Sequence, residues 1–205
     1  VHFFMGGLDI DTNCRTGIQG LLAAGEIGGG LHGANRYGGN ALTETAVFAR
    51  IAAAQAVRFL EGSGSNLAGD REVRDWLRDQ DLVWKRALGK SSGEGPAPAA
   101  IRHRLQRLMW EQAGLIRSEE SLALAESGLD QLREQMNRVG IERRQLIPYL
   151  EEDNRLLTAR MIVKAARMRL ESRGAHFRED YPETDPAWTR HISIRKTGGR
   201  MQLVL

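Results

Sequence analysis

"GGGLHGANRYGGNALTETAVFARIAAAQAVRFLEG", residues 28–62, joins a glycine-rich loop to a long alanine-rich run. Six glycines surround one histidine, one arginine and two asparagines before Leu42. Because glycine adopts positive φ and lacks a side chain, this loop is either a flexible linker or a surface shaped closely against a ligand. The run from about Ala41 to Gly62 predicts a helix with a glycine stop. The N-terminus of that helix, with its unpaired N–H groups, suits negative charge on a ligand.

The residues before the loop predict short strands and turns. Leu8 and Ile10 alternate with two aspartates, and the apolar run between Gly20 and Gly25 is typical of a buried strand. Glu26 then stands at a strand end, where a carboxylate can accept hydrogen bonds from ligand hydroxyls. The glycines at 28, 30 and 33 match G-x-G-x-x-G, but no helix begins there, and position 53 is alanine rather than an acid. This stretch therefore does not predict the dinucleotide fingerprint.

Residues 63–98 predict a linker, because "GSGSNLAGD" and "GKSSGEGPAP" have the composition of turns and connectors. Trp76 and Trp84, between these two stretches, are interpreted as packing anchors.

Residues 99–173 carry apolar residues at helical spacing in three segments, with breaks near 116–118 and 140–148. The expected apolar faces are Ile101, Leu105, Leu108 and Met109; Leu122, Ala125, Leu129, Leu132, Met136 and Val139; and Leu157, Met161, Ala165 and Met168. They predict an antiparallel three-helix bundle, with a surface for a partner helix as the alternative. "HISIRKTGGRMQLVL" at the end predicts a β-hairpin. The fold class is therefore α+β.

Composition narrows the functional classes. A net charge of +3 over 205 residues, with the charges interleaved, argues against nucleic-acid binding. No apolar run approaches the ~18 residues of a membrane span. Cys14, the single cysteine, is expected to be a buried thiol, and it excludes an internal disulfide. The chain begins at Val1 without a signal peptide or initiator methionine, so we expect a piece of a longer protein.

Four blocks resemble the flavoprotein subunit of fumarate reductase and succinate dehydrogenase. They are "HFFMGGLDIDTNCRT", "GLLAAGEIGGGLHGANRYGGNALTETAVFAR", "LMWEQAGLIRS" and "ESRGAHFREDYPETDPAW", which span nearly the whole chain in order. L-aspartate oxidases and adenylylsulfate reductases are related. Composition and periodicity divide the chain into residues 1–62, 63–98 (linker), 99–183 (helical bundle) and 184–205 (loop and hairpin). The resemblance implies that residues 1–62 are the C-terminal segment of an FAD- and substrate-binding domain.

The resemblance also implies roles for individual residues. His2, Arg36 and Gly39 match the residues that hold the substrate, a small dicarboxylate. The planar guanidinium of arginine suits a carboxylate because it donates two parallel hydrogen bonds. The FAD contacts of the family match Phe3, Glu26, Ala41 and Leu42.

The implied activity is hydride transfer between the flavin and the dicarboxylate. The family's proton-donating arginine lies upstream of the blocks matched here, so no catalytic residue is assigned, and the chain alone is not expected to turn over. Tyr37 replaces a common leucine, and Phe3-Phe4 replaces the frequent Tyr-Thr or His-Thr; both changes bear on which acid fits. An iron–sulfur subunit is the implied partner, and the cytoplasm, at the membrane face through partner subunits, is the implied location.

Other polar residues are interpreted as structural. We expect His32 to bond the loop, Glu44 and Arg50 to be surface or packing residues, and Arg173 to cap a helix C-terminus beside His176. Asp180, Glu183 and Asp185 lack a histidine at ligand spacing, so no metal site is predicted. The alternative to the enzyme hypothesis is a helical module that docks a partner subunit.

Overall fold

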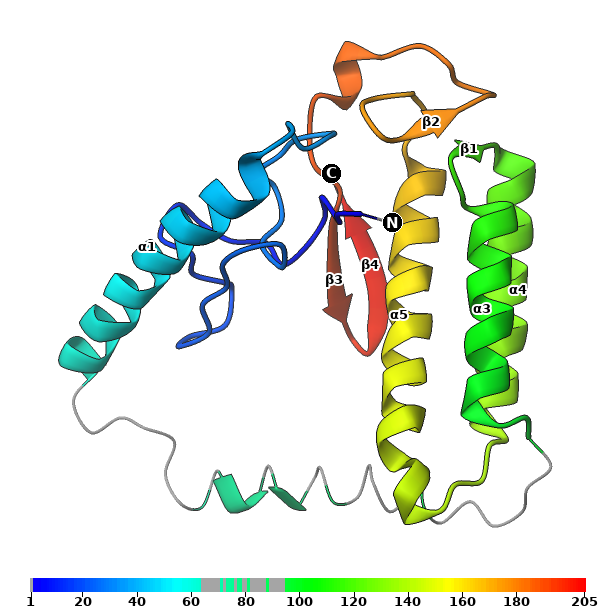
Figure 1. Cartoon of the computed structure of the whole chain (residues 1–205), viewed down its shortest axis with the longest axis horizontal. Helices are drawn as coiled ribbons and strands as arrows, with labels where there is room; N and C mark the ends of the chain where they lie inside the picture. Colours follow the sequence, from blue (N-terminus) through cyan, green and yellow to red (C-terminus); the bar gives the residue numbers. More distant parts are fainter. Residues whose placement is uncertain are drawn as a thin grey trace. The chain divides into compact units, whose positions relative to one another are not determined.

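The computed structural model describes residues 2–63 and 95–205 and, between these ranges, residues 71, 73–75, 77, 78, 81 and 88. The chain divides into two compact units, Val1–Gly69 and Asp70–Leu205. Figure 1 shows a long helix with loops in the first unit, and a helical bundle with a terminal hairpin in the second. Most of the predicted linker 63–98, with Trp76 and Trp84, lies outside the described residues.

The loops of the first unit are joined by isolated β-bridges rather than by strands. Leu8 pairs with Gly28 in parallel, and Arg15 pairs with Leu22 in antiparallel. The segments that the sequence predicts as extended do pair, but each pairing is a single bridge. Gly20 and Gly25, close to these bridges in the sequence, have positive φ, which is not the conformation of a strand.

Gly7 allows two backbone segments of this unit to approach closely. The N–H of Leu8 donates to the carbonyl oxygen of Ile27 at 2.7 Å, and the N–H of Gly29 donates to that of Leu8 at 2.8 Å. A Cβ on Gly7 would lie 2.2 Å from the carbonyl oxygen of Ile27. The loop that carries the glycines is therefore held against the first segment of the chain by close backbone contacts.

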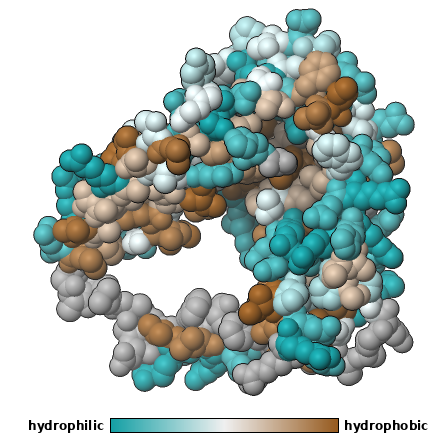
Figure 2. All heavy atoms as spheres, in the orientation of Figure 1, coloured by the Kyte–Doolittle hydropathy of each residue, from teal (hydrophilic) through white to brown (hydrophobic). Residues whose placement is uncertain are grey.

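Helix α1 (Asn40–Ser63) packs one face on these loops, which bond its residues at Glu44, Phe48 and Gln55. Its inner face includes Glu44 and Phe48, and the fully buried Cys14 donates a hydrogen bond from Sγ to the carbonyl oxygen of Phe48 at 3.4 Å. Burial raises the pKa of the Cys14 thiol, which fits the structural role predicted for it. The outer face is also apolar: Leu42, Val57 and Leu60 are exposed, and Figure 2 shows apolar residues along this helix.

The second unit contains the predicted bundle, formed by α3 (Pro98–Gln112), α4 (Glu119–Asn137) and α5 (Leu146–Met168), with a 3-10 turn, η1 (Arg143–Gln145), before α5. The three helices run up, down and up side by side (Figure 1). Pro98 opens α3, and Ser118 caps α4 by accepting from the N–H of Ser121 at 3.2 Å. The core consists of Ile101, Leu105, Ala113, Leu122, Ala125, Leu129, Leu132, Met136, Val139, Ile141, Tyr149, Leu156, Ala159, Val163 and Ala166.

The prediction of which face of α5 enters the core is wrong. Leu157 is 45% exposed, and Met161, Ala165 and Met168 are only half-buried, whereas Leu156 and Val163 are fully buried. The helix carries apolar side chains on two faces, so the period alone does not decide which face turns inward. Contact with α3 and α4 selects the face that contains Leu156.

Ion pairs tie the outer edges of α4 and α5 together. Arg160 pairs with Asp130 at 3.2 Å, and Arg133 pairs with Asp153. Glu126 forms ion pairs with both Lys164 and Arg167. Opposite charges thus recur along the antiparallel seam.

Short elements close the bundle at one end. Strand β1 (Ile116–Arg117), which follows α3, pairs in parallel with β2 (Phe177–Arg178), which follows α5. The 3-10 turn η2 (Pro186–Trp188) leads to the predicted hairpin, β3 (Ser193–Thr197) and β4 (Arg200–Val204), in antiparallel register. Gly198 and Gly199 both have positive φ, as a two-residue hairpin turn requires.

Within the described residues, no helix has both the length and the apolarity needed to cross a bilayer.

Candidate functional site

The glycine-rich loop of the first unit brings Arg36 over the ring of Phe3. The Cζ atom of Arg36 lies 4.6 Å from the ring centroid, which is a cation–π distance. Nη1 of Arg36 donates to the carbonyl oxygen of Tyr37 at 3.3 Å. Its Nε atom is buried and has no hydrogen-bond partner among the described residues. The guanidinium is therefore positioned by an aromatic face, and its charge is not neutralised by a carboxylate in the described part of the chain.

A second contact on Phe3 extends this cluster to α1. The rings of Phe3 and His32 meet edge to face, with centroids 5.3 Å apart and planes at 74°. Nε2 of His32 lies 2.7 Å from Oε2 of Glu44. The sequence predicts that His32 bonds the loop, whereas in the structure it bonds a carboxylate on the helix.

Glu26 connects the loop to the N-terminal segment. Its Oε1 accepts a hydrogen bond from the backbone N–H of Phe4 at 2.9 Å, 22 residues away. Glu26 is exposed, so its second oxygen remains accessible for a hydroxyl or N–H donor.

The end of the loop offers open space beside backbone. A Cβ on Gly33, Gly38 or Gly39 would meet nothing within 4 Å, and Gly39 has a φ of +87°. Helix α1 begins one residue later, so the N–H groups of its first turn have no carbonyl partner within the helix. Exposed backbone, a helix N-terminus and an arginine thus come from one continuous stretch, residues 33–42.

The predicted site residues are placed as follows. Phe3 and Arg36 are in direct contact, and Glu26 holds the residue next to Phe3. His2 is exposed and precedes Phe3 in the chain; Leu42 is 82% exposed at the first turn of α1, where Ala41 is half-buried.

Glu44 is the residue whose importance the sequence interpretation missed. The sequence interprets it as a surface or packing residue; in the structure it is packed, at 5% exposed, and it also pairs with His32, which the sequence did not predict. One signal points to it: Glu44 lies four residues before Phe48, on the face of the helix that turns toward the loop.

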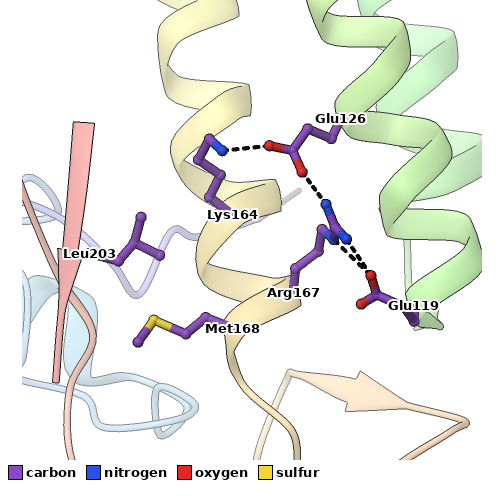
Figure 3. A pocket seen from close by; sticks show the side chains of 6 residues that line it. All are labelled: Glu119, Glu126, Lys164, Arg167, Met168 and Leu203. Carbon is purple, nitrogen blue, oxygen red and sulfur yellow. Dashed lines mark hydrogen bonds and ion pairs between the residues drawn. The ribbon is translucent and has the colours of Figure 1, made fainter. Parts of the chain in front are cut away.

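The second unit has an open hollow of about 470 Å³ lined by residues of α4, α5 and β4. Figure 3 shows Glu119 and Glu126 pointing at Arg167, Lys164 bonding Glu126, and Met168 and Leu203 on the other side. Because its acids and bases bond one another, this hollow is a set of satisfied ion pairs and not the candidate site.

The polar cluster after α5 is structural, but its cap is not the one predicted. The side chain of Arg178, fully buried, donates from Nη1 to the carbonyl oxygen of Ala166 at 3.1 Å, near the end of α5. Arg173 instead bonds Glu171 through Nε and Nη2, at 2.8 and 3.0 Å. The expectation that Arg173 caps the helix is therefore wrong, because Glu171, two residues away, captures its guanidinium.

His176 lies beside Arg117, with Nδ1 of His176 2.8 Å from Nη1 of Arg117. Burial, and then the neighbouring guanidinium of Arg117, lower the pKa of His176 to about 4. Asp180 bonds Arg178, and Asp185 accepts from the N–H of Ala187. The described residues include no group of three or more histidine, cysteine or acidic side chains arranged to hold a metal ion.

Comparison with known families identifies the class of protein. The model for the fumarate reductase flavoprotein C-terminal region matches residues 102–204, half of the chain, and the model for an FAD-binding domain matches residues 1–42. The chain therefore belongs to the fumarate reductase flavoprotein C-terminal family, which confirms the resemblance drawn from its motifs. The match of residues 1–42 also supports FAD as the cofactor.

Individual relatives agree with this family. The chain is 38% identical over 200 residues to a subunit of the fumarate reductase (CoM/CoB) of Methanothermobacter marburgensis, covering 95% of this chain and 35% of the relative. It is 34% identical to an L-aspartate oxidase of Synechocystis, covering 96% and 37%. A quinol fumarate reductase structure from E. coli has a TM-score of 0.89 at 31% identity, covering 98% and 36%. The chain thus spans about a third of the length of these relatives.

Proposed function

We propose that this chain forms the C-terminal part of an FAD-dependent oxidoreductase. The whole enzyme would interconvert a small unsaturated dicarboxylate and its saturated form, such as fumarate and succinate, by hydride transfer to or from the flavin. Its family and the names of its relatives support this assignment, which concerns the whole protein. On this proposal, residues 1–62 contribute to the flavin and substrate domain, residues 63–98 link it to the bundle at 99–183, and residues 184–205 close the chain.

The observation that carries the proposal is the state of Arg36. Its guanidinium is ordered by the face of Phe3, its Nε atom is buried without a partner, and no carboxylate bonds it in the described ranges. Leaving such a donor unsatisfied costs free energy, about 1–3 kcal/mol for a buried polar group. A ligand carboxylate would satisfy it with charge-assisted bonds.

The substrate would be held by three groups. Arg36 binds one carboxylate of the acid, and His2 donates an imidazole N–H to a carboxylate. Gly39 has no side chain and therefore adopts a φ of +87° without strain, and its exposed main chain would lie against the acid. Fixed positive charge around the carboxylates stabilises the negative charge that develops on the acid during the reaction.

The cofactor would be held by Phe3, Glu26, Ala41 and Leu42. Oε1 of Glu26 accepts from the N–H of Phe4, so its other carboxylate oxygen would accept from a hydroxyl of FAD, and the N–H groups of Ala41 and Leu42, in the first turn of α1, would donate to the flavin ring. Bound FAD supplies the hydride acceptor and donor. The residues of this chain bind, orient and exclude water; the proton donor is expected in the remainder of the protein.

The test uses the full-length protein. Its flavin absorbance should be perturbed by fumarate or succinate, and Arg36→Ala should abolish that perturbation and turnover. Arg50→Ala, at an exposed position of α1, is the matched control and should leave both unchanged. A colourless full-length protein, or an Arg36→Ala variant with normal turnover, would overturn the proposal.

The L-aspartate oxidase relative favours a second candidate, oxidation of L-aspartate at the same site. Tyr37, 80% exposed beside Arg36, is the residue most able to alter which acid fits. Anaerobic reduction of the flavin by aspartate, rather than by succinate, would favour this candidate.

A partner subunit is part of the proposal. The relative from Methanothermobacter is named as a subunit. On this proposal, an iron–sulfur subunit at the cytoplasmic face of a membrane would accept or supply electrons. The helical bundle at residues 99–183 could dock such a subunit. Co-purification of the full-length protein from its own cells tests whether a partner subunit binds.

A further inference from the structure

Glu44 is a buried acid whose burial needs an explanation. Its side chain is 4% exposed and the side chain of His32 is 8% exposed. Only Oε2 is bonded, and Oε1 has no partner among the described residues. Burying a carboxylate is costly unless hydrogen bonds satisfy it, so a half-satisfied acid at this position destabilises the unit.

The hydrogen bond fixes the orientation of the His32 ring. With Nε2 of His32 as the donor, Oε2 of Glu44 accepts a hydrogen bond over 2.7 Å, and this bond holds the ring. The helix supplies the carboxylate near its start, whereas the histidine comes from the glycine-rich stretch between Gly30 and Gly33. A rigid element thereby anchors a glycine-rich loop.

The orientation of His32 is transmitted through Phe3. The edge-to-face contact of the two rings sets the plane of Phe3, and the Cζ atom of Arg36 lies 4.6 Å from the centroid of that same ring. Each contact depends on a ring plane, so rotation of His32 would displace the surface on which Arg36 rests. No carboxylate in the described ranges holds Arg36 instead.

We propose that Glu44 is a positioning residue for the dicarboxylate site: through His32 and Phe3 it holds the guanidinium of Arg36 in place without bonding it, so that the N–H donors not used by the carbonyl oxygen of Tyr37 are left for the acid. This inference rests on the proposed role of Arg36 in binding a dicarboxylate. A direct Glu44–Arg36 pair would neutralise the guanidinium, whereas two intervening rings transmit position without charge neutralisation.

The experiment compares variants of the full-length, FAD-loaded protein. The readout is the dissociation constant of malonate, an unreactive dicarboxylate, measured by calorimetry, together with flavin content, kcat and KM. Glu44→Ala removes the hydrogen-bond acceptor, and Glu44→Asp shortens the side chain by one methylene. Glu44→Gln keeps an oxygen acceptor on a side chain of the same length. Glu61→Ala, an exposed acid on the same helix, is the matched control.

We expect Glu44→Ala to weaken malonate binding about tenfold with flavin content unchanged, because small displacements of a binding group lower affinity steeply. Glu44→Asp should weaken it severalfold, and KM should rise more than kcat falls. Glu44→Gln and Glu61→Ala should bind malonate like the parent protein. The double variant His32→Ala with Glu44→Ala should bind malonate no more weakly than either single variant, because both substitutions break the same chain of contacts.

Malonate binding at the parental affinity in Glu44→Asp and, if it folds, in Glu44→Ala would overturn the positioning role. So would equal weakening in Glu44→Gln, which would mean that charge and not orientation matters. The proposed function fails separately: Arg36→Ala would then bind malonate normally. Should Glu44→Ala not fold, the Glu44→Asp and Glu44→Gln pair decides the question by itself.

Discussion

The guanidinium of Arg178 forms a two-bond ion pair with the carboxylate of Asp180, Nε to Oδ1 at 2.8 Å and Nη2 to Oδ2 at 2.6 Å. The same guanidinium donates from Nη1 to the carbonyl oxygens of Ala166 and Arg167, at 3.1 and 3.3 Å. These carbonyls belong to the last turn of α5 and have no partner within the helix. One buried cation therefore satisfies the helix end and joins it to β2.

We expect Arg178→Lys to lower the free energy of unfolding by about 2–3 kcal/mol, because an ammonium cannot reproduce the planar fork and loses charge-assisted bonds in a buried position. Urea denaturation followed by circular dichroism measures the loss. Arg195→Lys, on the exposed side of β3, should change stability by less than about 0.5 kcal/mol. Equal effects of the two variants would contradict the capping role.

Gly7→Ala should disrupt the first unit. The new Cβ would lie 2.2 Å from the carbonyl oxygen of Ile27, so the backbone of one segment must move and the hydrogen bonds of the parallel bridge are lost. We expect a loss of about 1–3 kcal/mol and reduced flavin binding in the full-length protein. Gly17→Ala, whose Cβ meets nothing within 4 Å, should be neutral or stabilising by about 0.4–1 kcal/mol. A destabilised Gly17→Ala would count against this steric explanation.

Arg102 and Arg107 lie on the same helix but differ in what they bond. Nε of Arg102 donates at 2.7 Å to Glu152, whose side chain is fully buried, and Arg107 pairs with the exposed Glu111. Arg102→Ala should cost about 1.5–3 kcal/mol because it leaves part of a buried charge uncompensated. Arg107→Ala should cost at most about 0.5 kcal/mol. Thermal or urea unfolding of the two variants tests the difference, and similar losses would show that burial of Glu152 does not matter.

Stability should fall in two steps on acidification. The pKa of His176 is lowered to about 4, so the unfolded chain binds a proton more readily, and stability is lost as the pH falls from about 6.5 to 4. Bonds from Arg173, Asp185 and Arg169 lower the pKa of Glu171 to about 2. The stability that Glu171 contributes is complete above about pH 4.5 and is lost as the pH falls toward 2.

Urea midpoints measured across this range separate the two groups. His176→Gln should flatten the curve between about pH 6.5 and 4, whereas His103→Gln, at an exposed position of α3, should not. Glu171→Gln should flatten only the lower part. A His176→Gln curve parallel to that of the parent protein would refute the assignment.

The helices were predictable because their signals are local. Pro98 and Ser118 stand at helix starts, and apolar residues of α4 such as Leu122 and Leu129 recur at the helical period, so propensity, cap and pattern agree. The inward face of α5 was not predictable, because Leu156 and Leu157 fit the period equally well. Contact with two neighbouring helices chose Leu156.

The candidate site divides in the same way. Its residue types, the glycine loop, the helix start and the family follow from the sequence alone, because these depend on order along the chain. That Phe3 lies under Arg36 and that Glu44 bonds His32 is known only from the tertiary structure, because these contacts join residues up to 33 positions apart. Such contacts depend on how the loop folds back on α1, and a linear pattern does not encode the distance between two side chains.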